Sequence, residues 1–155
     1  MNINKVLQTE ALIINIDYKK SMVKLLVKEV GICFFGLKNL YCINVMQGLF
    51  LEIKYINQFT RNSIYDVRII GLINKKGYLY WGLLSLLYYL LSELLFEGSD
   101  ADEIYEHIRL LKHEEYISIL NFIYIIVLCL NKCGFLYSNN DLYVFYKYLF
   151  GNIYS

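Results

Sequence analysis

Lysines recur at regular steps through an apolar stretch of the chain, DYKKSMVKLLVKEVG, which spans residues 17–31. Lys20, Lys24 and Lys28 share one parity, while residues 23–27 carry valine and leucine at the other parity. Because an extended strand points alternate side chains to opposite faces, the amines would line one face and the apolar groups the other. A row of ammonium groups can contact the phosphates of a nucleic acid without reading its bases. The pattern supports an ordinary solvated sheet face equally well.

The other residue types that carry out chemistry are sparse and poorly arranged for catalysis. His107 and His113 are six residues apart, so they do not share a helical face closely. The four cysteines include no C-x-x-C pair, and Cys129 with Cys133 makes an incomplete zinc site. The sequence has no phosphate-cradling glycine loop, no H-E-x-x-H motif and no nucleophile elbow. We therefore expect no enzymatic activity, no metal and no cofactor.

The composition is that of a protein with ample material for a core. The chain has 155 residues, of which 57% are hydrophobic and 19% charged, which suits one domain or a small domain with a helical extension. Residues 1–77 carry eleven Lys and Arg against five Asp and Glu, whereas residues 78–155 carry four against nine. This asymmetry predicts two domains, 1–77 and 78–155, with different surfaces. The polar start lacks the features of a signal peptide, so we expect a cytoplasmic protein.

Up to about residue 73, hydrophobic residues recur mainly with a period of two, which predicts short antiparallel strands. The five expected strands lie around Leu12–Ile16, in the lysine stretch, and at Ile32–Gly36, Leu49–Ile56 and Tyr65–Ile70. Five strands of this length suit a small closed barrel, because closure removes exposed sheet edges. The five-stranded oligonucleotide-binding (OB) barrel is the commonest such fold. An SH3-like barrel is the main rival, and the pattern does not separate the two.

Beyond Gly77 the hydrophobic period lengthens to that of helices, which makes the expected fold class α+β. The expected helices are Leu79–Phe96, one capped by Ser99 or Asp100, Glu114–Lys132 and Leu142–Phe150. Asp102 and Glu103 suit the first turn of the second helix, where the helix dipole favours anions, better than they suit a cation site. No Gly- or Ser-rich linker separates the strands from the helices, so we expect the two parts to pack together.

Several segments resemble, in order, those of the RecO family of bacterial recombination-repair proteins. The segment TEALIINIDYKKSMVKLLVKEVGICFFGLK (9–38) is similar to the start of that family, with its T-E-A opening and its T-[KR]-E-x-G turn. VMQGLFLEIKY (45–55) resembles the element before the family's fourth strand. LFEGSDADEIYEHIRLL (95–111) and LNFIYIIVLCLNKCGFLYSNNDL (120–142) resemble its helical passages. The resemblance spans residues 7–142 and rests on the order of the motifs.

The resemblance implies an OB barrel followed by an α-helical domain, and a non-catalytic role. It implies binding of single- and double-stranded DNA, annealing of complementary strands, and work with RecR to load recombinase onto strands coated by single-strand binding protein. The chain departs from the family pattern in three ways. Lys19-Lys20 stands in the turn where the family usually has Gly-Glu. Residues 36–43 offer only Lys38 where the family has a basic run, and no cysteine-rich zinc module follows Asp141-Leu142. We therefore expect a shortened member with reduced affinity for DNA.

The DNA contacts that we expect are the outward cations of the barrel. They are Lys19, Lys20, Lys24, Lys28, Lys38, Lys54, Arg61 and Arg68. Each would contribute a phosphate contact, so affinity would fall steeply with salt. Tyr18 and Phe50 are candidates for base stacking, although packing at a barrel rim is the favoured interpretation for both.

Two other interpretations remain open from the sequence. In the first, the apolar helices form a protein-interaction module that takes the acidic, hydrophobic tail of single-strand binding protein, without appreciable DNA affinity. In the second, residues 78–96, which only Glu93 interrupts, and residues 116–130 form a membrane hairpin. We favour the DNA-binding interpretation and expect no membrane association.

Overall fold

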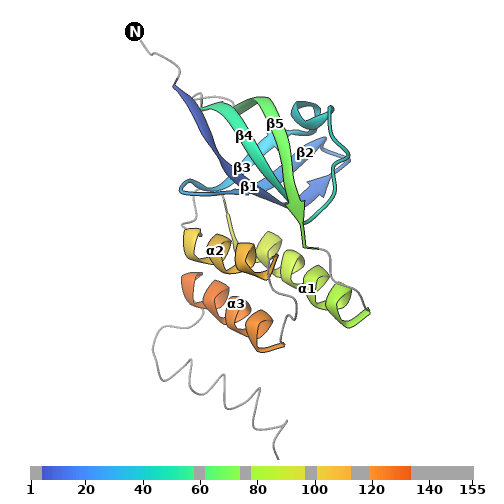
Figure 1. The fold of residues 1–155 in the computed structure, drawn as a ribbon, viewed down its shortest axis with the longest axis vertical. Coiled ribbons are helices and arrows are strands. Elements are labelled where there is room, and N and C mark those ends of the chain that lie inside the picture. Colours follow the sequence, from blue (N-terminus) through green and yellow to red (C-terminus); the bar gives the residue numbers. More distant parts are fainter. Residues whose placement is uncertain (1–4, 58–61, 74–77, 97–100, 113–118, 134–155) are drawn as a thin grey trace, which may run out of the picture.

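The computed structural model describes residues 5–57, 62–73, 78–96, 101–112 and 119–133. Within them the chain is α+β: a five-stranded antiparallel sheet is followed by three helices, which confirms the expected fold class (Figure 1). The strands are β1 (Val6–Asp17), β2 (Met22–Val27), β3 (Gly31–Gly36), β4 (Leu49–Asn57) and β5 (Asn62–Leu72). A short 3₁₀ helix, η1 (Leu37–Leu40), follows β3.

The sheet has the strand order β3-β2-β1-β4-β5, so the first strand lies at its centre. β1 pairs with β2 on one side and with β4 on the other, and every pair is antiparallel. The two outer strands, β3 and β5, also approach each other, which shows that the sheet curls strongly (Figure 1). The predicted turn at Gly31 is confirmed, because Gly31 has φ +101°.

Two hydrophobic cores lie on opposite faces of the sheet. Ala11 and Ile13 of β1 belong to the inner core, which the curled sheet encloses together with Leu25, Leu51 and others. Leu12 and Ile14 belong to the outer core, which the sheet shares with the helices. Because successive residues of a strand point to opposite faces, a strand buried on both sides needs the continuous apolar run that β1 has there.

The helices cover the outer face of the sheet. They are α1 (Tyr78–Leu94), α2 (Asp102–Leu111) and α3 (Ile119–Lys132), and they lie together beside the sheet in Figure 1. Leu84, Leu87 and Leu91 of α1 supply the outer core, which also contains Leu26 of β2 and Ile32 of β3. The shared core means that the strands and helices pack directly on each other, as expected.

The helix predictions are confirmed where the structure describes them. The predicted helix Leu79–Phe96 corresponds to α1, and the predicted helix Glu114–Lys132 corresponds to α3, whose first predicted turn lies outside the described residues. The second predicted helix corresponds to α2, but its N-cap is Ala101 and not Ser99 or Asp100, so the predicted cap is wrong. Ser99, Asp100 and the predicted helix Leu142–Phe150 lie outside the described residues. Among the described helices, none combines the length and the apolar character that crossing a bilayer requires.

Candidate nucleic-acid interface

The outward face of β2 and β3 is covered, not open. Lys24 points outward, as its parity predicts, yet its side chain is only 8% exposed. Its ammonium group donates to the carbonyl oxygens of Ser92, at 2.5 Å, and Leu95, at 2.6 Å. Burial lowers the pKa of Lys24, and the charge of Glu93 acts in the opposite direction. An amine held in this way at the end of α1 is not available to a phosphate.

The neighbours of Lys24 on this face are likewise packed against other residues or paired with them. Leu26 and Ile32 are buried in the outer core, and Phe34, 39% exposed, has the Lys24 ammonium 5.7 Å from its ring centroid. Lys28 lies 3.4 Å from the carboxylate of Glu106 on α2. The hydrogen bond from Arg109 holds the pKa of Glu106 below its usual value, so this carboxylate stays charged opposite Lys28.

Two further predicted cations form ion pairs across β4 and β5. Arg68 lies 2.9 Å from Glu52, and Lys54 lies 3.9 Å from Asp66. Both pairs are exposed, and each contributes little to stability. Their charges cancel locally, however, so they add little net attraction for a polyanion.

The remaining predicted cations gather near one end of the sheet. Lys19 and Lys20 are exposed in the turn between β1 and β2, and Lys38 is exposed on η1. Within the described residues none of the three ammonium groups forms an ion pair, although the backbone N–H of Lys20 donates to the carboxylate of Asp17 at 3.1 Å. The backbone N–H of Leu37 donates to the carbonyl of Ser21 at 2.8 Å, which ties η1 to that turn. Arg61 lies outside the described residues.

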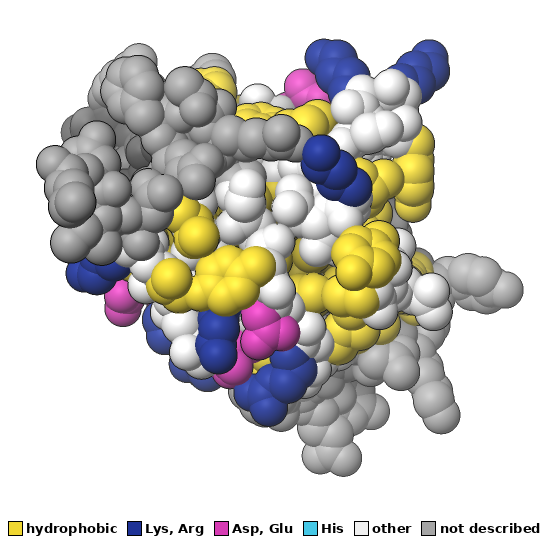
Figure 2. Space-filling model, turned by 90° about the horizontal axis from the view of Figure 1, so that it is seen from above, with side chains coloured by type: hydrophobic (Ala, Val, Ile, Leu, Met, Phe, Trp, Pro, Cys, Tyr) yellow, Lys and Arg dark blue, Asp and Glu magenta, His cyan; other side chains and the backbone are white. Residues whose placement is uncertain are grey.

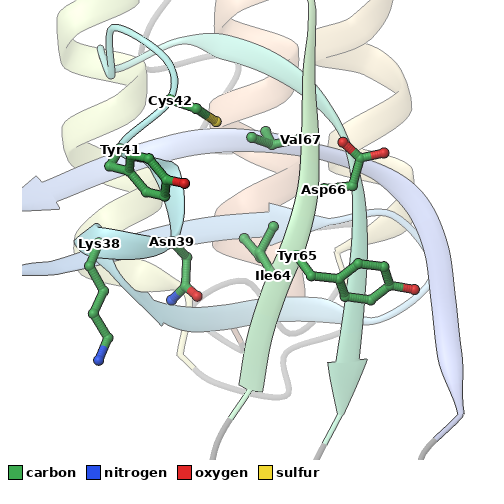
Figure 3. A pocket seen from close by; sticks show the side chains of 8 residues that line it. All are labelled: Lys38, Asn39, Tyr41, Cys42, Ile64, Tyr65, Asp66 and Val67. Carbon is green, nitrogen blue, oxygen red and sulfur yellow. The ribbon is translucent and has the colours of Figure 1, made fainter.

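A groove runs between η1 and β5, with a volume of about 570 Å³. Lys38, Asn39, Tyr41 and Cys42 line one side, and residues 64–67 of β5 line the other (Figure 3). A second hollow of about 520 Å³ lies on the other side of η1, against the β1–β2 turn. Lys38 and Tyr41 line both hollows, so η1 forms a ridge between them.

Exposed tyrosines accompany the unpaired lysines on this surface. Tyr18 is 70% exposed, Tyr41 88% and Tyr65 53%. Tyr18 and Tyr41 line the second hollow, and Tyr41 and Tyr65 line the groove. Figure 2, which views the molecule from above, shows hydrophobic, basic and acidic side chains interspersed on that face of the protein. Phe50, in contrast, is 1% exposed and packs edge-on against Tyr105, so it cannot stack on a base.

The sequence interpretation did not select Tyr41 or Tyr65. Their signal was weak: Tyr41 stands in an irregular connection, and Tyr65 is one aromatic residue among many on alternating strands. Their exposure depends on the fold, because η1 crosses the end of the sheet next to β5. Among the described residues, no group of three or more His, Cys, Asp or Glu side chains is arranged to hold a metal ion.

Comparisons with known proteins do not assign this chain to a family. Neither a protein-family model nor a curated protein sequence matches it.

Proposed function

We propose that this chain is a non-catalytic DNA-binding accessory protein of recombinational repair, similar to the RecO family. It binds single-stranded and, more weakly, double-stranded DNA, and it brings complementary strands together. The proposal is supported by the ordered motifs of residues 7–142 and by the surface that combines unpaired lysines with exposed tyrosines. Cations that track phosphates and aromatic rings that stack on bases are the two elements of sequence-tolerant single-strand binding.

We further propose that the curled sheet is an OB barrel. Consecutive pairing from β1 to β3, a long connection through η1, and return of β4 to the free side of β1 make a Greek-key order. A simple meander would pair β3 with β4, and these two strands are not neighbours in the sheet. The approach of β3 to β5 supports closure of the barrel.

The observation that carries the proposed function is the surface made by Lys19, Lys20 and Lys38 beside Tyr18 and Tyr41. The three lysines lie on two segments that a backbone hydrogen bond joins, and among the described residues none of their ammonium groups forms an ion pair. Three phosphate contacts to a single strand would give log K a slope of about −2 against log salt. Affinity would then fall about twentyfold between 50 and 200 mM salt.

Fluorescence anisotropy with a labelled oligothymidylate of 20 nucleotides, at 50 and 200 mM salt, tests this function. We expect binding at low salt that weakens about twentyfold at the higher salt. A chain that does not bind at 50 mM salt, or binds equally at both concentrations, contradicts the proposal. An annealing assay with two complementary labelled strands then tests the second part of the function.

RecR and single-strand binding protein are the partners that we propose, on the resemblance alone. A pull-down with each purified protein, without DNA, tests them separately. Capture of the single-strand binding protein tail by a chain that fails to bind DNA would favour the protein-interaction alternative.

A further inference from the structure

The usual ligand surface of an OB barrel is the face of strands 2 and 3 with the adjoining loops. In this chain the helices cover that face. Lys24 is held by the carbonyls of Ser92 and Leu95, and Leu26 and Ile32 are buried in the core that the helices share. A strand of DNA could reach this face only if α1 moved away. A bound strand must therefore follow another route.

The open route crosses η1. The hollow on one side of this ridge reaches Tyr18 and Ser21 in the β1–β2 turn, and the groove on its other side reaches β5. Lys38 and Tyr41 border both, so together they form one continuous surface from the turn to β5. Lys19 and Lys20 stand in the turn where this surface begins.

The groove between η1 and β5 has the properties of a site for bases. Its volume of about 570 Å³ falls within the usual range for ligand sites, about 300–1,000 Å³. Figure 3 shows Tyr41 on the η1 side, Ile64 and Val67 across from it, and Tyr65 on β5 with its ring directed away from Tyr41. Both rings are well exposed, Tyr41 in the groove and Tyr65 beyond β5, so each can stack on a base of a strand that crosses β5.

The charges on the two sides of the groove determine on which side the phosphates of a bound strand lie and on which side its bases lie. Lys38 stands on the η1 side, and Asp66 stands on the β5 side, where Lys54 lies 3.9 Å from its carboxylate. Lys38 attracts a phosphate, whereas the Asp66 carboxylate and the Lys54 ammonium largely cancel each other on the opposite side. The backbone of a bound strand therefore belongs over η1, with the bases directed toward β5.

We infer that a single strand of nucleic acid runs over η1, from the β1–β2 turn to β5, with bases in the groove against Tyr41 and a further base against Tyr65 beyond β5. This inference rests on the proposed function and adds the route and the form of the ligand. Bases in a duplex are paired and stacked, so their faces cannot enter the groove. Single strands therefore bind more tightly here than duplexes of the same length.

Substitutions at the groove test the route directly. Tyr41→Ala, Tyr65→Ala and Lys38→Gln alter exposed side chains, so the fold should persist, and circular dichroism checks this. The matched control is Tyr89→Ala, which removes a tyrosine that is 60% exposed on α1. With the oligothymidylate, we expect each tyrosine substitution in the groove to weaken binding at least about fivefold, and Tyr89→Ala to have no effect.

Thiol footprinting gives a second measurement on the unaltered protein. Cys42 is exposed and lines the groove, Cys33 and Cys129 are buried, and Cys133 is partly buried near the end of α3. Saturating oligothymidylate should slow alkylation of Cys42 by iodoacetamide several-fold and leave the rate at Cys133 unchanged. Mass spectrometry of peptides separates the two sites.

The possible outcomes test the route over η1 separately from the proposed DNA-binding function on which it rests. If the unaltered chain fails to bind the oligonucleotide, the proposed function and the inference both fail. If it binds, but Tyr41→Ala and Tyr65→Ala bind equally well and Cys42 is not protected, the function stands and the route over η1 is wrong. Equal affinity for single strands and duplexes would also overturn the route.

Discussion

The ammonium nitrogen of Lys24 lies 2.6 Å from the carbonyl oxygen of Leu95, 71 residues further along the chain. The same ammonium group also reaches the carbonyl of Ser92. The last carbonyls of a helix lack partners within the helix, and they carry the negative end of its dipole. The ammonium group of Lys24, on β2, donates hydrogen bonds to these carbonyls and places a positive charge at the negative end of the α1 dipole. A lysine on the outward parity of the sheet thus joins the sheet to the helices.

Replacement of Lys24 by Met should destabilise the protein by about 1–3 kcal/mol, because one buried and one partly buried carbonyl lose a charged donor. Met keeps most of the apolar stem, so the loss reports on the ammonium group. Urea unfolding at pH 7 measures the change in the free energy of unfolding. Lys20→Met, on the exposed turn, is the control and should change this free energy by less than about 0.5 kcal/mol. Equal stability of Lys24→Met and the original chain would show that the two hydrogen bonds contribute nothing.

Gly48 should not tolerate alanine. It has φ +92°, and a Cβ atom there would lie 2.9 Å from the hydroxyl oxygen of Tyr88 on α1. Strain in the left-handed region and the clash with a buried ring together should cost about 1–3 kcal/mol. Thermal or urea unfolding of Gly48→Ala measures the cost.

Gly82→Ala is the matched control for that substitution. Gly82 lies inside α1, and a Cβ atom there would meet nothing within 4 Å. Alanine should therefore stabilise the helix by about 0.5–1 kcal/mol. The same chemical change thus has opposite signs at the two glycines, and a loss of stability at both would contradict this account of Gly48.

The strands, their turns and the main helix could be predicted from the sequence, because these depend on local periodicity. The position of Lys24 could not, since its partners lie 68 and 71 residues away. One hint was present: Leu26 shares the parity of the lysines, and a buried leucine between Lys24 and Lys28 marks a face that is partly covered. The groove also escaped prediction, because η1 meets β5 only through the curl of the sheet.

Removal of the three unpaired lysines should make DNA binding less dependent on salt. The loss of affinity should be large at low salt and small at high salt. Lys19→Gln, Lys20→Gln and Lys38→Gln together should lower the magnitude of the single-strand slope by about 2, at about 0.7 for each phosphate contact. Anisotropy titrations at four salt concentrations measure the slope.

The control for the lysine substitutions is the double substitution Arg68→Gln with Glu52→Gln. This change removes an exposed cation together with the carboxylate 2.9 Å away, so the net charge is unchanged. We expect a slope equal to that of the original chain. A slope that falls as much in this control as in the lysine variant would mean that DNA contacts the face of β4 and β5 instead.

Tyr105 should make the protein less stable at high pH. Its buried hydroxyl donates to the carboxylate of Glu10 at 3.2 Å, and burial first, then the charge of Glu10, raises its pKa far above the usual 10.0. As pH rises through 10, an unfolded chain loses this proton while the folded chain keeps it. The folded state then binds more protons, so stability falls by about 1.4 kcal/mol per pH unit for this residue.

Tyr105→Phe separates this effect from other alkaline changes. Below pH 9 the variant should be less stable by about 0.5–1.5 kcal/mol, because the hydrogen bond to Glu10 is lost. Above pH 10 the difference should shrink and then reverse, since phenylalanine has no proton to lose. Urea unfolding at pH 7, 9, 10 and 11 follows both curves. Parallel curves across this range would show that the hydroxyl of Tyr105 ionises equally in the folded and unfolded chains.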